Sequence, residues 1–182
     1  MKEEMRREML DMRQSLSEQS VVRGSEAITK QLLSLPCVQN AQRVMTYCAV
    51  KNEPDMWALT QALLDMGKSM ALPCVTAEGL LAANFCSNTK MQRGAYGIPQ
   101  PVITSDSDKV EPDVVIVPGV VFDLQRYRIG FGAGYYDRFL QYRGVVKIGV
   151  CYESQLVDNI EAEPHDVRMD YVVTERRILG EV

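Results

Sequence analysis

Several residue types that build common kinds of site are scarce in this chain of 182 residues. Histidine occurs once, at His165, and the five cysteines include no C-x-x-C pair, so we expect neither a zinc site nor a disulfide framework. Basic residues do not outnumber acidic ones, and the formal net charge is −4. A basic surface for nucleic acid is therefore not expected, although local basic groups can still bind nucleotide phosphates.

Long hydrophobic runs are missing as well. No apolar segment is long enough to cross a bilayer, and the start of the chain, MKEEMRREML, lacks the apolar stretch of a signal peptide. We expect a soluble protein of the reducing cytoplasm with no membrane partner, and a monomer. No repeat or interdomain linker is evident, and we expect one domain over residues 1–182. That length suits a single domain, because single domains commonly hold roughly 100 to 200 residues.

Helix and strand patterns alternate along the chain. Apolar residues at helical spacing indicate a first helix: Met5, Met9, Met12 and Leu16. Its basic residues fall on other faces: Lys2, Arg6, Arg7 and Arg13. A second helix is predicted over residues 21–35 with Pro36 as its stop, and a third has Pro54 in its first turn and Gly67 as its cap.

Strands are predicted between these helices and after them, over residues 43–49, 69–73, 114–117, 145–151 and 171–174. A short strand or hairpin is expected over residues 80–86, followed by an ordered loop that reaches residue 109. Strands separated by helices favour parallel pairing with right-handed crossovers. The expected fold is therefore a single layered α/β domain, Rossmann-like, with a mainly parallel central sheet flanked by helices.

The most informative segment runs from Val117 to Leu140 and reads VPGVVFDLQRYRIGFGAGYYDRFL. It is interpreted as a strand, a loop and a helix, with Gly130, Gly132 and Gly134 at alternate positions before the helix. Glycines so spaced let backbone N–H groups approach an anion, and a helix N-terminus adds a positive dipole end. This pattern favours phosphate binding, but glycine-rich turns also serve only to connect a strand to a helix. Neither a Walker loop nor a dinucleotide fingerprint is present.

Two charged residues flank these glycines. Arg128 can supply a fixed charge and a forked set of donors for phosphate oxygens, and Asp137 can hold a magnesium ion from a solvent-facing position. The alternative makes Arg128 a solvated surface charge and Asp137 a helix-start residue favoured by the dipole. Ligands of open parallel sheets collect beyond the carboxyl ends of the strands. Residues 47–53, residues 118–134 and the segment after Cys151 are therefore expected to converge.

Taken together, several motifs resemble the 5-formyltetrahydrofolate cyclo-ligase family, also called 5,10-methenyltetrahydrofolate synthetase. In chain order they are Lys2 with Arg6, Tyr47 followed by Glu53-Pro54-Asp55, Tyr96-Gly97-Ile98-Pro99-Gln100-Pro101, the segment above, and His165-Asp166 before Met169-Asp170. The resemblance covers nearly the whole chain. It implies ATP-dependent closure of 5-formyltetrahydrofolate, with or without a polyglutamate tail, to the 5,10-methenyl form. ADP and phosphate are released after a phosphorylated formyl intermediate, and Mg²⁺ assists.

The resemblance also implies the site residues. The ATP contacts are Lys2, Arg6, Arg128, Ile129, Gly130, Phe131, Gly132, Ala133, Gly134, Tyr135 and Tyr136. The folate contacts are Cys48, Glu53, Tyr96, Phe131 and Tyr135. The magnesium ligands are Asp137 and Asp166, and the residues expected to carry catalysis are Arg128 and Asp137.

Each role has a purely structural alternative. Lys2 and Arg6 can be solvated helix charges, and Asp166 can cap a turn after His165, which is not expected to act as a base. Glu53 can be an acid at the start of a helix beside Pro54. The tyrosines of the glycine segment can belong to the core, and Tyr96 can anchor a loop.

Two residues depart from the family pattern. Arg126 stands where relatives often have glycine, and Ala133 replaces a position that is commonly glycine or lysine. A positive φ at Ala133 would strain its backbone. The competing functions are a regulatory module that binds nucleotide and folate without turnover, and another enzyme such as a sugar-phosphate isomerase or a coenzyme A transferase. Dependence of activity on ATP separates these alternatives.

Overall fold

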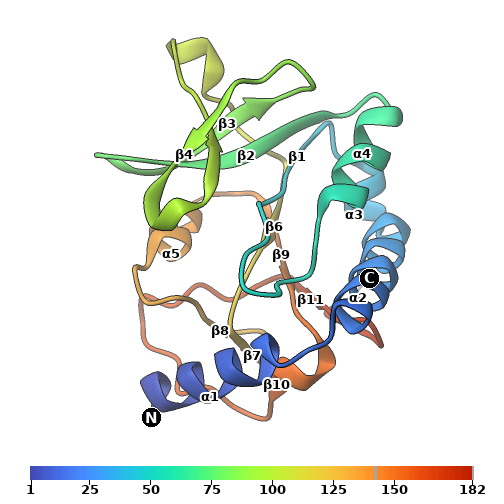
Figure 1. Ribbon diagram of the computed structural model, residues 1–182, viewed down its shortest axis with the longest axis vertical. Helices are drawn as coiled ribbons and strands as arrows, with labels where there is room; N and C mark the ends of the chain where they lie inside the picture. The colour runs from blue at the N-terminus through green and yellow to red at the C-terminus, as the bar shows by residue number, and fades with distance from the viewer. Residues whose placement is uncertain (142, 182) are drawn as a thin grey trace.

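A computed structural model describes residues 1–141 and 143–181 (Figure 1). Seven strands form the central sheet in the order β12-β11-β9-β6-β1-β2-β3. They are β1 Arg43–Met45, β2 Ser69–Thr76, β3 Gly79–Phe85, β6 Val114–Val117, β9 Val146–Val150, β11 Tyr171–Val173 and β12 Ile178–Leu179. The inner pairs are parallel, and only the edge strands β12 and β3 pair antiparallel. The expected mainly parallel α/β sheet is confirmed.

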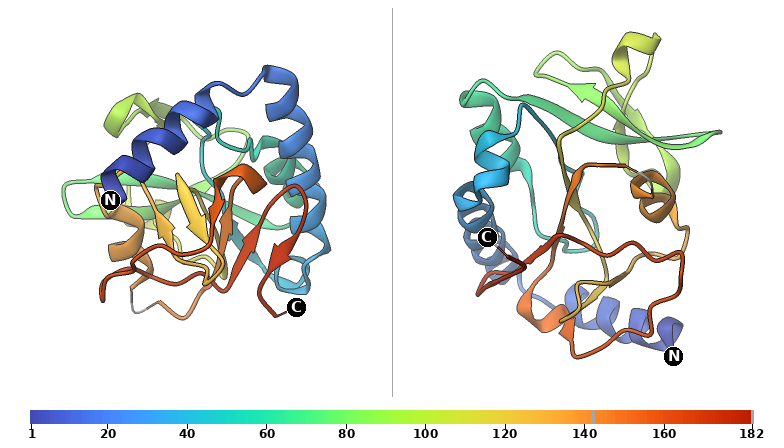
Figure 2. Two further views of the ribbon diagram at one scale, coloured as in Figure 1. Left: turned by 90° about the horizontal axis from the view of Figure 1, so that it is seen from below. Right: turned by 180° about the vertical axis from the view of Figure 1, so that it is seen from behind.

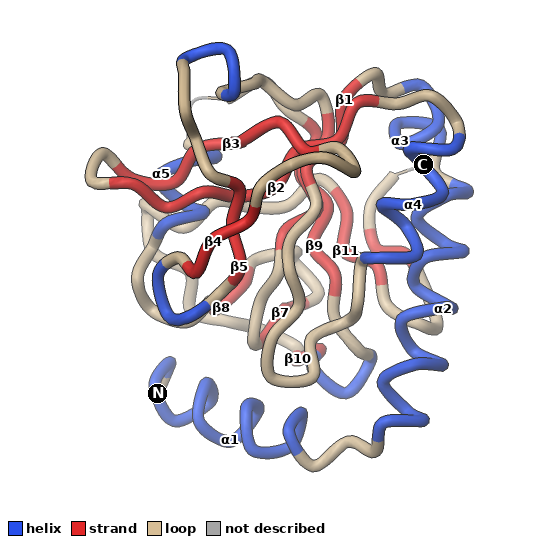
Figure 3. The backbone as a smooth tube through the Cα atoms, turned by 45° about the horizontal axis from the view of Figure 1, so that its top comes forward, coloured by secondary structure: helices blue, strands red, loops and turns tan. Residues whose placement is uncertain are grey.

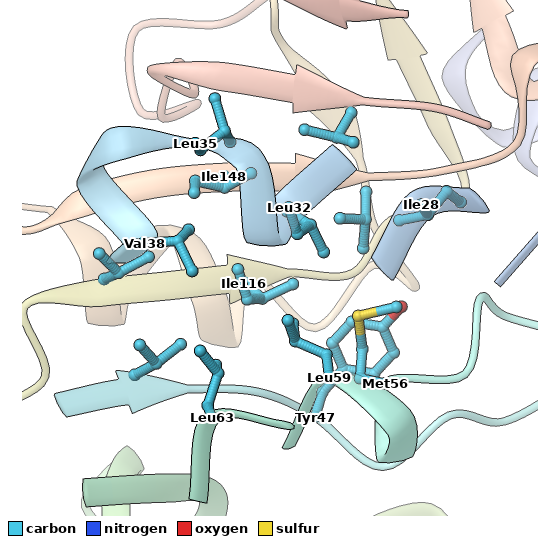
Figure 4. Packing of buried hydrophobic residues seen from close by; sticks show 14 of the residues in the cluster. Ile28, Leu32, Leu35, Val38, Tyr47, Met56, Leu59, Leu63, Ile116 and Ile148 are labelled. Carbon is cyan, nitrogen blue, oxygen red and sulfur yellow. The ribbon is translucent and has the colours of Figure 1, made fainter. Parts of the chain in front are cut away.

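The α-helices are α1 Lys2–Gln14, α2 Glu18–Ser34, α3 Pro36–Asn40, α4 Trp57–Asp65 and α5 Tyr135–Leu140. All of them except α1 cover the faces of the central sheet. Helices α2, α3 and α4 lie on one side and α5 on the other (Figures 1 and 2). Alternate strand residues serve the two faces, as the pleat requires. Ile116 packs with Leu32 and Leu63 of the first side (Figure 4), and its neighbours on β6 pack with Phe139 and Leu140 of the second.

Helix α1 does not cover the large sheet. It lies against a small sheet formed by β10 Leu156–Val157, β7 Val121–Asp123 and β8 Arg128–Ile129. Met5 and Met9 of α1 pack on Val120, Val121 and Ile129, so the apolar stripe expected in this helix has a partner. Strands β1 and β6 both run toward this end of the molecule before their loops begin (Figures 1 and 3). Helix α1 therefore crosses the carboxyl end of the sheet.

Several local predictions are confirmed. The first helix, the strands at β6, β9 and β11, and the strand at β3 lie where the sequence places them, within a residue or two. Gly67 has φ +79 and ends α4, with its N–H donating to Leu64 O and the N–H of Lys68 donating to Leu63 O. These two bonds form a Schellman cap. Among the described residues no helix has both the length and the apolar character needed to cross a membrane.

Other local predictions are wrong. Helix α4 begins at Trp57 rather than at Pro54, with Met56 as its N-cap residue, and Asp55 Oδ1 accepts the Trp57 N–H at 2.9 Å in the turn that precedes the helix. The strand expected over residues 43–49 ends at Met45. Pro36 stops α2 but also starts α3, where a proline at the first position is tolerated. Part of the loop expected before residue 109 is a hairpin of β4 Met91–Arg93 and β5 Pro99–Pro101.

The segment after Val117 is also more folded than a strand, a loop and a helix. It contains the β7–β8 hairpin, which the sequence analysis did not anticipate because strands of two or three residues have no detectable periodicity. The same reason applies to β10 and β12.

Candidate functional site

Loops from three strands meet at the carboxyl end of the sheet. Gly119, which follows β6, accepts hydrogen bonds from Arg13 of α1 at 3.0 Å and from Gln155 at 3.3 Å. Arg13 also donates to Lys51 O, in the loop that follows β1, at 2.9 Å. The expected convergence of the segments after β1, β6 and β9 is therefore observed.

The glycine segment forms an open loop under α1. Gly132 and Gly134 have φ +103 and +66, values that L side chains rarely adopt, so glycine is required there. Arg6 Nε donates to Gly130 O at 2.8 Å, and the Arg6 guanidinium lies 3.7 to 3.9 Å from the point that a Cβ on Gly132 would occupy. Helix α5 has only six residues. Any anion held here would therefore be bound by loop N–H groups and basic side chains more than by a long helix dipole.

Arg128 is not the surface charge that the alternative reading proposed. Its side chain is 3% exposed and its guanidinium pairs with the carboxylate of Asp137, at 3.3 Å between Nη2 and Oδ1. The Arg128 Nε atom is buried without a hydrogen-bond partner. Burial lowers the pKa of Arg128, although the charge of Asp137 opposes this effect. A buried donor without a partner is the feature that a bound anion would satisfy.

Asp137 is less exposed than expected. Its side chain is 18% exposed, and Oδ1 also accepts the backbone N–H of Val167 at 3.3 Å. The expectation of a solvent-facing position is therefore wrong, because the chain before β11 folds over this helix. Asp137 is held by Arg128 on one side and by the Val167 amide on the other.

Asp166, the second expected metal ligand, lies in the same charged group. Lys2 Nζ lies 2.7 Å from Asp166 Oδ2 and 3.3 Å from Glu163. Partial burial raises the pKa of Asp166, but hydrogen bonds from the Glu163 amide and from Lys2 lower it below its usual value. Its charge also acts on Arg128. No group of three or more His, Cys, Asp or Glu side chains within residues 1–141 and 143–181 is arranged to hold a metal ion. A metal at Asp137 and Asp166 would therefore need ligands from a substrate.

A cavity of about 630 Å³ opens beside the loop that follows β1. Its walls come from this loop, the start of α4, strand β2 and the segment from β3 to β4. Cys48 and Glu53 line it, as do Trp57, Phe85 and Met91. Trp57 is 59% exposed and its ring lies edge-on to Phe85, with 6.2 Å between centroids. The cavity thus has an apolar rim and a carboxylate in its lining, which suits a flat aromatic ligand with hydrogen-bond donors.

Glu53 is the buried acid of this cavity. Its side chain is 3% exposed, Oε2 accepts the Val50 N–H at 3.0 Å, and Oε1 has no hydrogen-bond partner. Burial raises the pKa of Glu53 to about 7, while Arg13, the Val50 amide and Lys51 act to lower it. The alternative role as a helix-start acid is wrong, because α4 begins four residues later, at Trp57.

The aromatic residues of the predicted site differ in how far they are buried and in what they contact. Tyr136 is the most enclosed, with its hydroxyl buried and without a hydrogen-bond partner, and burial raises its pKa. The Arg128 guanidinium carbon lies 5.8 Å from the centre of the Tyr136 ring, and the charges of Glu53 and Arg128 both act on its phenol. Tyr135 faces Arg138, at 5.3 Å. Tyr96 is 79% exposed and does not line the cavity.

Phe131 connects the glycine segment to the loop after β1. Its ring lies 5.3 Å from Lys51 Nζ and 5.8 Å from the Arg13 guanidinium. A second hollow, of about 820 Å³, runs between this ring and the exposed side of α1. Charges of both signs line that hollow, from Glu3, Glu4 and Asp11 and from Arg6 and Arg7.

Arg13 is the residue of this region that the sequence analysis misplaced. It was assigned to a charged face of the first helix, yet its side chain is fully buried. A signal was available, because Arg13 lies four positions after Met9 and therefore on the apolar stripe that Met5 and Met9 begin. A charge on an apolar stripe is expected to have a buried partner.

The two departures from the family pattern also differ from each other. Arg126 has φ +72, so it adopts the left-handed conformation that glycine favours. Ala133 is not among the non-glycine residues with positive φ, so the strain considered for it does not arise.

Comparisons with known proteins all indicate the same family. The sequence model of the 5-formyltetrahydrofolate cyclo-ligase family matches residues 1–175. A 5-formyltetrahydrofolate cyclo-ligase of Mycolicibacterium smegmatis is 30% identical, with 97% of this chain and 94% of the relative covered. The NMR structure of Aquifex aeolicus 5,10-methenyltetrahydrofolate synthetase superposes with a TM-score of 0.87 at 35% identity, covering 98% of this chain and 92% of that one. A 5,10-methenyltetrahydrofolate synthetase from Mycoplasma pneumoniae shares the fold, with a TM-score of 0.75 at 24% identity over 96% of this chain and 98% of that one.

Proposed function

Because the chain belongs to the 5-formyltetrahydrofolate cyclo-ligase family, we propose that it converts 5-formyltetrahydrofolate to 5,10-methenyltetrahydrofolate with consumption of ATP. The observation that carries this proposal is the junction of two half-sites. A cavity with a buried carboxylate, Glu53, adjoins a group of paired charges around Arg128, and Tyr136 interacts with both. One half suits a pterin and the other suits a triphosphate.

The pterin end would use Glu53. The amino-pyrimidine part of a pterin offers two neighbouring N–H donors, which an ionised carboxylate accepts as a pair. Glu53 Oε1 is buried and lacks a hydrogen-bond partner, which is expected of an acceptor that binds a ligand. The apolar rim at Trp57, Phe85 and Met91 would contact the remaining aromatic part of the substrate.

The phosphate end would use the basic residues that converge on the glycine segment. Arg6 reaches it from α1, Lys2 of the same helix pairs with Asp166, and Arg128 has a buried Nε without a hydrogen-bond partner. The loop from Gly130 to Gly134 would contribute backbone N–H groups. These donors would neutralise a triphosphate and hold its γ-phosphate toward the cavity.

Asp137 and Asp166 suit a magnesium ion whose coordination shell is completed by substrate oxygens. Mg²⁺ in phosphoryl-transfer sites commonly has one or two carboxylate ligands plus phosphate oxygens and water. Both carboxylates lie near Arg128, and neither belongs to a group of three acids among the described residues. When bound, the ion would supply charge neutralisation to the triphosphate.

The chemistry requires activation of a poor leaving group. The formyl oxygen attacks the γ-phosphorus and the bond to ADP breaks, so that the formyl oxygen now bridges the formyl carbon and the transferred phosphoryl group. N10 attacks that carbon, loses its proton, and expels phosphate together with the former formyl oxygen. This sequence asks little of the protein as an acid or base, so orientation and charge neutralisation dominate. We further propose a monomer in the cytoplasm, in keeping with five cysteines that all remain free.

The direct test follows methenyl product by absorbance with purified protein, 5-formyltetrahydrofolate, ATP and magnesium. We expect product only in the complete mixture, and loss of product when any component is omitted. Asp158→Asn, at an exposed position outside the site, provides a control for preparation quality. Binding of both ligands without product would contradict an enzyme and favour the regulatory module. Turnover of another substrate without ATP would favour the isomerase or transferase alternatives.

A further inference from the structure

The loop that carries Glu53 has a strained turn. Lys51 and Asn52 have φ +50 and +59, and the Glu53 N–H donates to Val50 O at 3.0 Å. Two successive non-glycine residues rarely adopt left-handed φ values, so contacts from outside the turn are needed to hold it.

Those contacts come from the C-terminal end of α1. Asn52 Nδ2 donates toward the carbonyl oxygens of Arg13, Gln14 and Leu16, at 3.2 to 3.3 Å. In the opposite direction, Arg13 Nε donates to Lys51 O at 2.9 Å. The turn and the helix end therefore hold each other through side chains on both sides.

Arg13 also joins this turn to the other loops of the site. Its Nη1 donates to Gly119 O at 3.0 Å, and the Phe131 ring lies 5.8 Å from its guanidinium carbon. Its Nη2 lies 3.7 Å from Glu53 Oε1, and neither atom has a hydrogen-bond partner. Because Arg13 is fully buried and does not line the cavity, it does not reach a ligand there. Its effect on a ligand must pass through Glu53.

We propose that Arg13 is a positioning residue for the pterin end of the site: it fixes the Glu53 carboxylate within the strained turn and places its own charge beside Glu53 Oε1. This inference rests on the proposed function, which assigns the pterin to Glu53. The same helix carries Lys2 and Arg6 toward the phosphate end, so α1 supports both half-sites.

Several other charged or titratable groups lie around Glu53. Lys51, on the same turn, is a second cation, and its ammonium lies over Phe131. Tyr47, Tyr136 and Tyr152 interact with Glu53, and burial raises the pKa of each. These phenols stay neutral near pH 7. Burial raises the pKa of Glu53, and the charge of Arg13 is the largest of the effects that lower it.

The test measures the dissociation constant of 5-formyltetrahydrofolate by calorimetry between pH 5.5 and 9, without ATP, so that no turnover is needed. In the parent, affinity should weaken as the pH falls through about 7, where Glu53 becomes protonated. Arg13→Gln removes the opposing charge, so the inflection should move to higher pH and affinity at pH 7 should fall roughly tenfold for each unit moved. Arg13→Lys keeps the charge and should restore the inflection, with weaker affinity at every pH because the forked hydrogen bonds are lost.

Three further variants separate charge from folding. Glu53→Gln cannot ionise and should remove the inflection. Asn52→Gly keeps the left-handed backbone but removes the side-chain contacts to α1, so it should weaken affinity without moving the inflection. Arg7→Gln makes the same charge change at an exposed position of α1 and should leave the profile as in the parent.

If Arg13 has only a structural role, Arg13→Gln should lower the unfolding midpoint and the fraction of active protein but leave the pH of the affinity inflection in place. That result would overturn the inference. If Arg13→Gln does not fold, Arg13→Lys decides: affinity equal to the parent at all pH values would also overturn it. If the parent binds 5-formyltetrahydrofolate and the variants show the same pH profile of affinity as the parent, this inference alone is contradicted. A parent that does not bind it at all contradicts the proposed function.

Discussion

Lys2 and Asp166 are 164 positions apart in the chain, yet Lys2 Nζ lies 2.7 Å from Asp166 Oδ2. This ion pair joins the start of α1 to the segment before β11. It brings a basic residue of the proposed phosphate end next to a proposed metal ligand, so the ion pair connects the two sides of the proposed triphosphate site.

Replacement of Lys2 by glutamine should mainly affect the nucleotide. We expect KM for ATP to rise roughly tenfold, because one charge-assisted contact to phosphate is lost. KM for the folate should stay within about twofold of the parent value. Steady-state kinetics with each substrate varied in turn provides the measurement, and Arg7→Gln on the same helix is the matched control. An equal rise in both KM values would place Lys2 outside the phosphate end.

Asp137→Asn should lower both turnover and stability. Turnover should fall roughly 100-fold if the carboxylate serves a metal at the transferring phosphate. The unfolding midpoint should also fall by several degrees, because the buried guanidinium of Arg128 loses its partner. The measurements are turnover as a function of magnesium concentration and thermal unfolding, with Asp158→Asn as control. Turnover close to that of the parent would assign Asp137 a structural role only.

Trp57 should report substrate binding, because it is the only tryptophan of the chain and it lines the cavity. Its exposed indole should become less accessible to water when 5-formyltetrahydrofolate enters, which shifts its emission to shorter wavelength. ATP alone should cause no such shift. A fluorescence titration gives the measurement, and Glu53→Gln should move the titration to higher folate concentration. An unchanged emission at saturating folate would locate the substrate elsewhere.

Arg126 allows the strain of a left-handed residue to be measured. Replacement by alanine or glycine removes the same hydrogen bond, from Arg126 Nε to Met169 O at 3.2 Å. Only alanine keeps the unfavourable φ of +72. We therefore expect Arg126→Ala to be less stable than Arg126→Gly by about 1 kcal/mol in denaturant unfolding. Equal stabilities would mean that the turn changes shape in the variants.

Glu53 should make stability depend on pH in a direction unusual for a carboxyl group. Its folded pKa of about 7 lies above its ordinary value of 4.5, so the folded state binds more protons than the unfolded state between these two pH values. The contribution of this group to stability is therefore fully present below about pH 4.5 and is lost as the pH rises through about 7. The loss amounts to about 3 kcal/mol at most. Denaturant unfolding of the parent and of Glu53→Gln across this range provides the measurement, and parallel curves would contradict the raised pKa.

The sequence was informative wherever a pattern repeats over many residues. Met5 and Met9 predicted the buried stripe of α1, and the apolar runs predicted β6 and β9 within a residue. Gly67 predicted its helix cap because only a residue that tolerates positive φ suits that position. The hairpins of β4–β5 and β7–β8 were missed because they are stabilised by pairing between short segments, which leaves no periodicity in the sequence.

The candidate site shows the same division. The glycine segment, Arg128, Asp137 and Glu53 were identified from local sequence and family resemblance, and the structure gathers their backbones at one end of the sheet. Their environments were predicted poorly. Asp137 was expected to face solvent, a solvated surface charge was the alternative for Arg128, and Arg13 was placed on a face of the first helix away from the apolar stripe. All three are enclosed, because residues remote in the chain cover them.

By itself, then, the sequence determined the order of the main helices and strands and the parallel sheet, since these follow from local spacing and residue type, and its resemblance to the family indicated the candidate site residues. Only the tertiary structure decided which charges are buried and with whom they pair. Burial depends on which distant segments pack together, as Arg13 with Glu53 and Lys2 with Asp166 demonstrate. The raised pKa of Glu53 is a consequence of that packing, because desolvation is a property of the surroundings and not of the residue.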